Sequence, residues 1–175
     1  MTDDFALRVT TLLAANPRIC EFGCNILERD TSAHPRYEVY KKKVRDGFNT
    51  IDDKQMERFR KLSTFITATL HDPPVGRGGW LRIGSYGLKH ILERQKWTDD
   101  TNTYVSNGEA IVAMMLCGYK PRWEKDNSSP NCGFSVRSKL YQQLIQNSMR
   151  PTYPAKTSPT ADAVPSPCAC TSISP

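Results

Sequence analysis

Hydrophobic residues recur every three or four positions along several stretches of the chain, which is the spacing of one side of an α-helix. The longest of these stretches runs over 51–70, and its apolar positions are Met56, Phe59, Leu62, Ile66 and Leu70. Thr50 followed by Asp53 is an acidic variant of the capping box, which predicts the start of this helix. Pro73 lies just beyond its end, where proline prevents a helix from continuing.

Three further helices are predicted from the same spacing, over 4–15, 86–95 and 138–149. We expect Ser85 to cap the second of them. Residues 107–117 are different, because they are apolar on nearly every side. Ser106 and Glu109 form a complete capping box before this stretch, and Gly118 stands where a C-terminal cap belongs. The pattern predicts the buried central helix of the domain.

Two short runs have a β-type composition, 119–123 and 134–137. They flank the turn-rich stretch 124–133, so together they predict a β-hairpin. Another short strand is predicted over 80–83. Residues 18–35 show no sustained period, and they predict an irregular connection with a short turn of helix.

These elements predict a small, mainly helical α+β domain with one β-hairpin. We expect an N-terminal amphipathic helix and irregular arm over 1–35, the α+β core over 36–150, and a disordered tail over 151–175. The order of helix, helix, buried helix and hairpin is that of a winged helix-turn-helix, in which the helix before the hairpin enters the major groove.

Two features argue against groove reading by this chain. The connection over 96–105 has about ten residues, where a helix-turn-helix uses three or four. The buried helix also carries Glu109 as its only charged residue, whereas base reading needs Arg, Lys, Asn or Gln. Asn107 and Glu109, at the start of the helix, are the positions left to reach a base edge.

Composition adds a preference for polyanionic partners. The 175 residues include 24 Lys+Arg and 18 Asp+Glu, giving a formal net charge of +6 and a pI near 9.1. The mean hydropathy is -0.54, and the sequence predicts no spanning helix and no membrane partner. Six of the twelve prolines fall in 151–175 among many Ser and Thr, which is typical of disorder. The acidic N-terminus predicts no secretory signal, so we expect an intracellular protein with free thiols.

Two groups of basic residues are candidate nucleic-acid contacts. The densest cluster comprises Lys41, Lys42, Lys43 and Arg45. It suits contact with phosphate and also fits a short nuclear import signal; the alternative is a solvated helix face. The second group lies in and around the predicted hairpin and comprises Lys120, Arg122, Lys125, Arg137 and Lys139. Trp123 and Phe134 are candidate platforms for base stacking.

The cysteines offer a weaker indication of metal chemistry. Cys20 and Cys24 have three residues between them, and His34 follows. A structural zinc site needs four ligands, and no second pair outside the tail residues Cys168 and Cys170 has suitable spacing. We therefore expect no metal and no cofactor, and interpret Cys20 and Cys24 as buried thiols, with metal binding by either pair left open.

The sequence holds no paired carboxylates, no nucleophile beside its base and no phosphate-binding loop, so we expect a non-enzymatic protein. The favoured hypothesis is a nucleic-acid-binding protein, for DNA or RNA, that contacts the phosphate backbone or single strands. An accessory protein of a virus or mobile element is a typical setting for such a chain. The alternative is a protein-interaction adaptor that acts through its N-terminal helix and its tail, with the positive charge serving only solubility.

Overall fold

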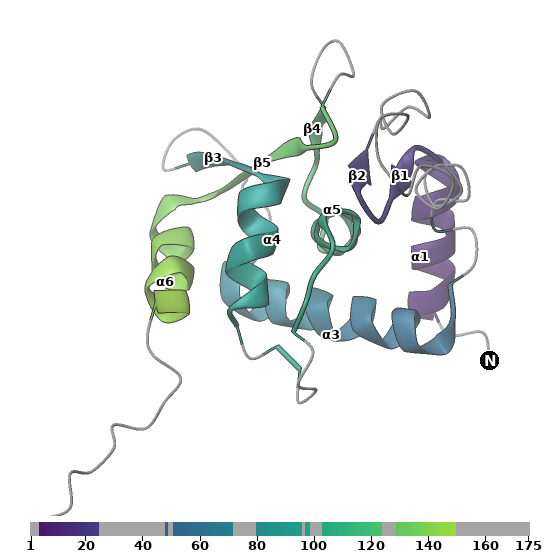
Figure 1. The fold of residues 1–175 in the computed structure, drawn as a ribbon, viewed down its shortest axis with the longest axis horizontal. Helices are drawn as coiled ribbons and strands as arrows, with labels where there is room; N and C mark the ends of the chain where they lie inside the picture. The colour runs from purple at the N-terminus through teal and green to yellow at the C-terminus, as the bar shows by residue number, and fades with distance from the viewer. Residues whose placement is uncertain are drawn as a thin grey trace, which may run out of the picture.

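A computed structural model of the chain describes residues 4–24, 48, 51–71, 80–95, 97–98, 103–123 and 129–149 (Figure 1). Its elements in chain order are α1 (Asp4–Ala15), β1 (Ile19–Cys20), β2 (Gly23–Cys24), α3 (Asp53–Leu70), β3 (Trp80–Gly84), α4 (Ser85–Glu93), α5 (Asn107–Leu116), β4 (Arg122–Trp123), β5 (Cys132–Arg137) and α6 (Ser138–Met149). The described part is mixed α+β and mainly helical, as predicted. The predicted tail, 151–175, lies outside the described residues.

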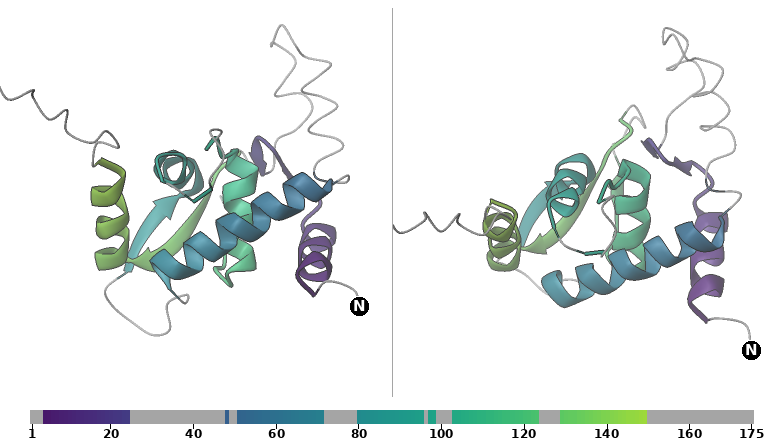
Figure 2. Two further views of the ribbon diagram at one scale, coloured as in Figure 1. Left: turned by 90° about the horizontal axis from the view of Figure 1, so that it is seen from below. Right: turned by 60° about the horizontal axis from the view of Figure 1, so that its bottom comes forward.

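Helix α5 occupies the centre of the domain (Figure 1). It packs against α3, α4 and α1, and the short β1–β2 hairpin covers its N-terminal end. Every residue from Asn107 to Met114 is buried. Helix α3 runs beneath it from the α1 side of the domain to the α6 side, as both views of Figure 2 show. The prediction of a buried central helix is confirmed.

A three-stranded antiparallel sheet lies beside the helices, with the strand order β3–β5–β4. Residues Trp80 to Gly84 of β3 pair with Arg137 to Gly133 of β5, and Arg122 and Trp123 of β4 pair with Gly133 and Cys132. The predicted hairpin is therefore present. The predicted strand over 80–83 also forms, and it joins the hairpin, which makes β5 the central strand.

Two predicted helix starts are wrong. Helix α3 begins at Asp53 and is capped by Asp52, whose carboxylate accepts a hydrogen bond from Gln55 N at 2.7 Å, so the cap is not the predicted Thr50, which lies outside the described residues. The residue before α4 is Gly84, which offers no side-chain cap. Ser85 is instead the first residue of α4, where its buried Oγ accepts a hydrogen bond from Cys132 N at 3.2 Å. It ties the helix to the central strand.

The β1–β2 hairpin was not predicted, because strands of two residues show no period. Glu21 and Phe22 form its turn, and Gly23, the first residue of β2, has φ 131°, a backbone conformation that favours glycine. Gly108 of α5 lies against the hairpin so closely that an added Cβ would stand 1.9 Å from Cys20 O. Gly108 N also donates to Glu21 O at 3.1 Å. The N-terminal segment is therefore packed on α5.

Among the helices that the structure describes, none combines the length and apolarity that crossing a bilayer requires.

Candidate nucleic-acid interface

The side of the sheet that faces away from the helices carries a concentration of arginine. Directly paired residues of neighbouring antiparallel strands point to the same side, and successive residues alternate. Phe134 and Val136 of β5 are buried, so the positions between them belong to the other side. Extending the register across the sheet gives one set, which we call the arginine face: Trp80, Arg82, Gly84, Arg122, Gly133, Ser135 and Arg137.

Each strand contributes one arginine to the arginine face, and none of its seven positions is acidic. Arg82, Arg122 and Arg137 are all exposed. They stand opposite Ser135, Gly133 and Trp80 respectively, so no two of these cations are directly paired across strands. This matters because two like charges in a direct cross-strand pair would destabilise the sheet.

Gly133 allows the Arg82 side chain to lie across the central strand. A Cβ built on Gly133 would lie 2.7 Å from Arg82 Nε, so the Arg82 side chain extends across the central strand at this point. Gly133 is also the partner of Arg122 in the register. Gly133 therefore leaves room for the Arg82 side chain on the arginine face.

Arg137 is positioned by an aromatic neighbour. Its guanidinium carbon lies 5.8 Å from the centre of the Trp80 ring, within the range of a cation–π contact. Trp80 is its direct partner in the register, so both belong to the arginine face. None of the seven described positions of this face is acidic, and guanidinium groups suit an anion with several oxygens, such as the phosphates of a nucleic acid.

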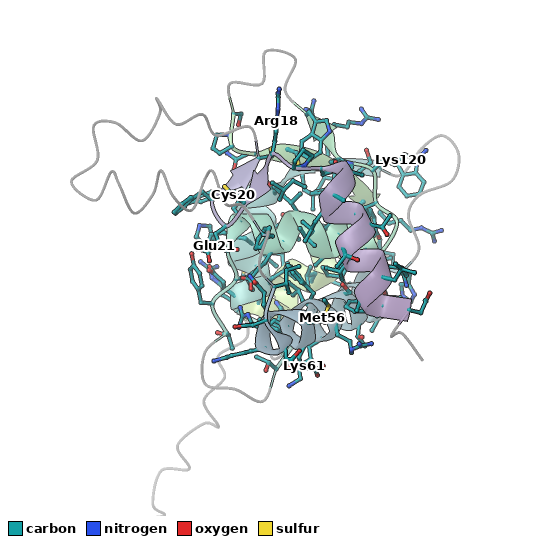
Figure 3. The ribbon with its side chains drawn as sticks, turned by 90° about the vertical axis from the view of Figure 1, so that its right-hand side faces the viewer. Arg18, Cys20, Glu21, Met56, Lys61 and Lys120 are labelled. Atoms are coloured by element: carbon teal, nitrogen blue, oxygen red, sulfur yellow. The ribbon has the colours of Figure 1, made fainter. Side chains whose placement is uncertain are left out.

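The predicted site residues are only partly brought together. Arg122 and Arg137 share the arginine face, two residues from Lys120 and Lys139, which are exposed where the chain enters β4 and leaves β5. Figure 3 shows Lys120 in the upper half of the molecule and Lys61 of α3 at the lower end. The other candidates lie outside the described residues: Lys41, Lys42, Lys43, Arg45 and Lys125.

The two aromatic candidates do not belong to the arginine face. Phe134 is 0% exposed in the core, so the expectation that it stacks on bases is wrong. Trp123 is 36% exposed and pairs with Cys132, which places its side chain on the opposite side of the sheet from Arg122. It faces the β1–β2 hairpin, where it lines a cavity with Cys24 and Arg18.

The start of α5 has no access to a groove. Asn107 and Glu109 are 5% and 7% exposed, so the expectation that they reach a base edge is wrong. The Asn107 amide donates to Pro130 O at 3.0 Å. The Glu109 carboxylate accepts from Arg58 Nε at 2.9 Å and from Ser106 N at 2.8 Å. Both side chains therefore hold the domain together.

The cysteines form a thiol pair. Cys24 and Cys132 are buried, and the hydrogen bond between their thiols lowers the pKa of Cys24. The same contact, together with burial, raises the pKa of Cys132. Burial also raises the pKa of Cys20. Within the described part of the chain, no group of three or more His, Cys, Asp or Glu side chains is placed to hold a metal ion.

A polar network joins α4 to the segment before α5. Lys89 Nζ donates to Glu93 Oε1 at 2.6 Å and to Val105 O at 3.1 Å, and His90 Nδ1 lies 2.9 Å from Glu93 Oε2. Burial alone would raise the pKa of Glu93, but its hydrogen bonds to Lys89, His90 and Val105 N hold that pKa below its ordinary value. This network holds α4 against the connection into α5.

Arg82 is the one cation of the arginine face that the sequence analysis missed. A signal was present, because Trp80-Leu81-Arg82-Ile83 alternates in the manner of a strand with one buried side. The pairing of β3 with β5 is what places Arg82 beside the hairpin cations, and a contact between segments about 50 residues apart leaves no local pattern.

Comparison of the chain with known protein families, with curated proteins and with solved structures gives no match.

Proposed function

We propose that this protein binds the phosphate backbone of nucleic acid through the arginine face. The observation that carries the proposal is the convergence of Arg82, Arg122 and Arg137, one from each strand, on a side of the sheet that has no acidic position. Guanidinium groups bind phosphate through two parallel N–H donors, so three of them in one plane suit successive phosphates of a strand. The candidates Lys41–Arg45 and Lys125 lie outside the described residues and stay predictions.

We further propose that residues 51–149 have a winged-helix arrangement. The order α3, β3, α4, α5, β4, β5 supports this, because a winged helix also places a strand between its first two helices and a hairpin after its third. The strand order β3–β5–β4, with the last strand in the middle, is consistent with it. The loop between β4 and β5 would be the wing.

In this arrangement the helix that usually enters the major groove is α5. Here α1 and the β1–β2 hairpin pack against it, and its starting residues are buried. The proposal therefore assigns contact to the sheet and gives it no base-reading role, so we expect binding that depends on strand type and salt more than on sequence.

The test is binding of labelled single- and double-stranded DNA and RNA, of about 20 nucleotides, across about 50 to 200 mM salt. The test variant carries Arg82→Ala, Arg122→Ala and Arg137→Ala. A matched control removes three cations elsewhere, with Lys54→Ala, Lys61→Ala and Arg94→Ala. For single strands, each lost phosphate contact should lower the slope of log K against log salt by about 0.7, so the test variant should lose about 2.

Binding that weakens equally in the two triple variants would show that net charge alone attracts the strand, and the arginine face would be rejected as the site. No binding of any of the four nucleic acids by the wild-type protein would reject the function. The adaptor hypothesis would then gain weight, although α1 already buries Val9 against the domain and leaves less of its apolar side for a partner.

A further inference from the structure

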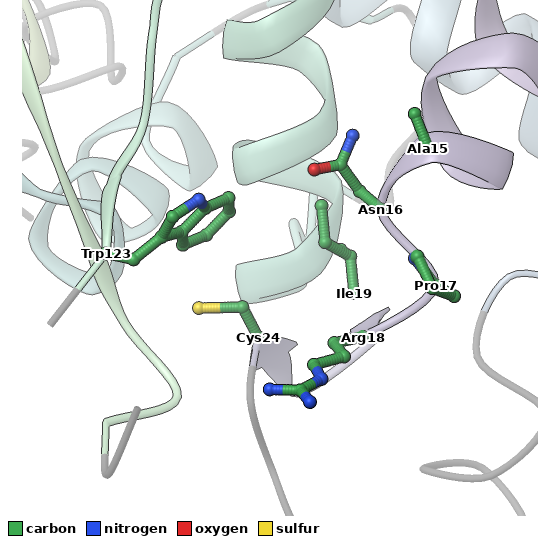
Figure 4. A pocket seen from close by; sticks show the side chains of 7 residues that line it. All are labelled: Ala15, Asn16, Pro17, Arg18, Ile19, Cys24 and Trp123. Atoms are coloured by element: carbon green, nitrogen blue, oxygen red, sulfur yellow. The ribbon is translucent and has the colours of Figure 1, made fainter. Parts of the chain in front are cut away.

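A cavity of about 270 Å³ opens beside the edge strand β4, between the end of α1 and the β1–β2 hairpin (Figure 4). We call it the Trp123 cavity, and its lining residues are Ala15, Asn16, Pro17, Arg18, Ile19, Cys24 and Trp123. Pockets for drug-sized ligands have volumes of about 300 to 1,000 Å³, so this cavity suits a single heteroaromatic ring.

The Trp123 indole provides a planar wall. In Figure 4 the ring stands across the cavity from Asn16 and Ile19, and the Cys24 thiol lies below the ring. Trp123 is 36% exposed, whereas Ile19 and Cys24 are buried, so the aromatic wall is the part of the cavity that a ligand can reach. An exposed indole beside a cavity of this size is suited to stacking against another flat ring.

Asn16 offers a hydrogen-bond acceptor of defined orientation. Its Nδ2 donates to Leu12 O at 2.8 Å, and only the amide nitrogen can make that bond. The orientation of the amide is therefore fixed, and Figure 4 shows its oxygen pointing toward the cavity, on the side of Trp123. A ring that carries an N–H donor at its edge would satisfy this oxygen.

Arg18 supplies a cation at the mouth of the cavity. Its side chain is exposed, and in Figure 4 the guanidinium extends toward the same opening as Cys24. In Figure 3 it projects at the upper end of the molecule. A nucleotide has a flat base with N–H donors joined to a phosphate. The base matches the Trp123 indole and the Asn16 oxygen, and the phosphate matches the Arg18 guanidinium.

Only the edge strand β4 separates the cavity from the arginine face. Arg122 and Trp123 are consecutive in β4, an edge strand, and they point to opposite sides of the sheet. A nucleic-acid strand held by Arg122 therefore needs to pass only the edge of β4 to bring one base to the Trp123 ring.

We infer that the Trp123 cavity binds one unstacked nucleobase of a single strand whose phosphates contact the arginine face. The base stacks on Trp123 and donates to Asn16 Oδ1, while Arg18 contacts the adjoining phosphate. This inference rests on the proposed function, and it adds a preference for single strands, because a base within a duplex is not free to enter the cavity.

The test compares Trp123→Ala and Trp123→Phe with the wild-type protein on a single-stranded oligonucleotide. Trp123→Ala should weaken binding about tenfold with an unchanged salt slope, because it removes stacking and no phosphate contact. Trp123→Phe should retain affinity within about threefold, since it keeps an aromatic ring. Arg18→Gln should lower the salt slope by about 0.7. Tyr86→Ala, which removes another exposed aromatic side chain, is the matched control and should bind as the wild type does.

A strand of the same length with abasic sugars separates the two proposals. The wild-type protein and Trp123→Ala should bind it equally, because it has phosphates but no bases. Equal affinity of these two proteins for the ordinary strand as well would overturn the inference and leave the arginine face in place. Absence of binding by the wild-type protein would overturn both. Circular dichroism of each variant establishes that it is folded.

Discussion

Helix α5 and the arginine face are two adjoining regions that use polar residues in opposite ways. The polar residues of α5 are buried and paired within the molecule, as Glu109 is with Arg58 and Ser106. The arginines of the sheet are exposed, and none of the seven described positions of the arginine face is acidic. The helix therefore organises the domain, and the sheet presents its charge to the outside.

This difference is the basis for proposing that the contact surface lies on the sheet and not on α5. The N-terminal segment covers α5, as the approach of Cys20 O to Gly108 shows. Covering the helix removes it from any partner, whereas the side of the sheet away from the helices keeps its cations exposed. Four substitutions test the contrast, in order of decreasing effect.

Gly108→Ala should have the largest effect on stability. The added Cβ would lie 1.9 Å from Cys20 O and 2.7 Å from Cys20 C, and these are backbone atoms that cannot move independently. We expect the free energy of unfolding to fall by about 3 kcal/mol, measured by urea denaturation.

Gly87→Ala is the matched control, because nothing lies within 4 Å of an added Cβ at this position in α4. It should stabilise the protein by about 0.5 to 1 kcal/mol, since alanine favours a helix over glycine. Equal stability of Gly108→Ala and the wild type would contradict the packing of the hairpin on α5.

Glu109→Gln should reduce the free energy of unfolding by about 2 kcal/mol, because it leaves the largely buried Arg58 without its charged partner. Affinity for an oligonucleotide should stay within about twofold, since Glu109 is not on the contact surface. Glu57→Gln, which alters an exposed ion pair with Arg60, should change stability by less than about 0.5 kcal/mol. A loss of binding in Glu109→Gln at full stability would give α5 a direct role.

Glu93→Gln should reduce stability at pH 7 by about 1 kcal/mol, because buried Lys89 loses its charged partner but keeps its hydrogen bond to Val105 O, and the other partner, His90, is partly exposed. The pKa of Glu93 is lower in the folded state than its ordinary value of 4.5. Its stabilisation is therefore present above that ordinary value, and it is lost as the pH falls through the lower folded value.

The measurement is urea denaturation of both proteins between pH 7 and pH 3. The difference between the wild type and Glu93→Gln should shrink below pH 4.5. A difference in the free energy of unfolding that stays constant over this range would show that the charge of the Glu93 carboxylate does not stabilise the network between α4 and the segment before α5.

Arg122→Gln should have the smallest effect on stability, less than about 0.5 kcal/mol by urea denaturation, because the side chain is exposed on an edge strand. Its effect should appear in binding, where the salt slope for a single strand falls by about 0.7. Lys61→Ala is the control for charge. A marked loss of stability in Arg122→Gln would mean that this arginine serves the fold.

Much of the fold was predictable because its helices are long enough to show a period. The spacing of Phe59, Leu62 and Ile66 located α3, and the capping box of Ser106 and Glu109 located the start of α5. The β1–β2 hairpin was not predictable, because a strand of two residues has no pattern and its place depends on packing against Gly108.

The site was half predictable for a similar reason. Arg122 and Arg137 were recognised because they belong to one local hairpin, whereas Arg82 enters through the long-range pairing of β3 with β5. Local composition also could not tell which side of the sheet each residue occupies. The register of β5 decides this, and it buries Phe134 while leaving Trp123 partly exposed.

The most direct test of the account is to locate the bound strand on the protein by NMR, with ¹⁵N-labelled protein titrated with a single-stranded oligonucleotide. The account predicts that the side-chain Nε–H signals of Arg82, Arg122 and Arg137 shift, and that the backbone amides of Ala110 to Met114 in α5 do not. Shifts concentrated in α5, with the arginine signals unchanged, would contradict it.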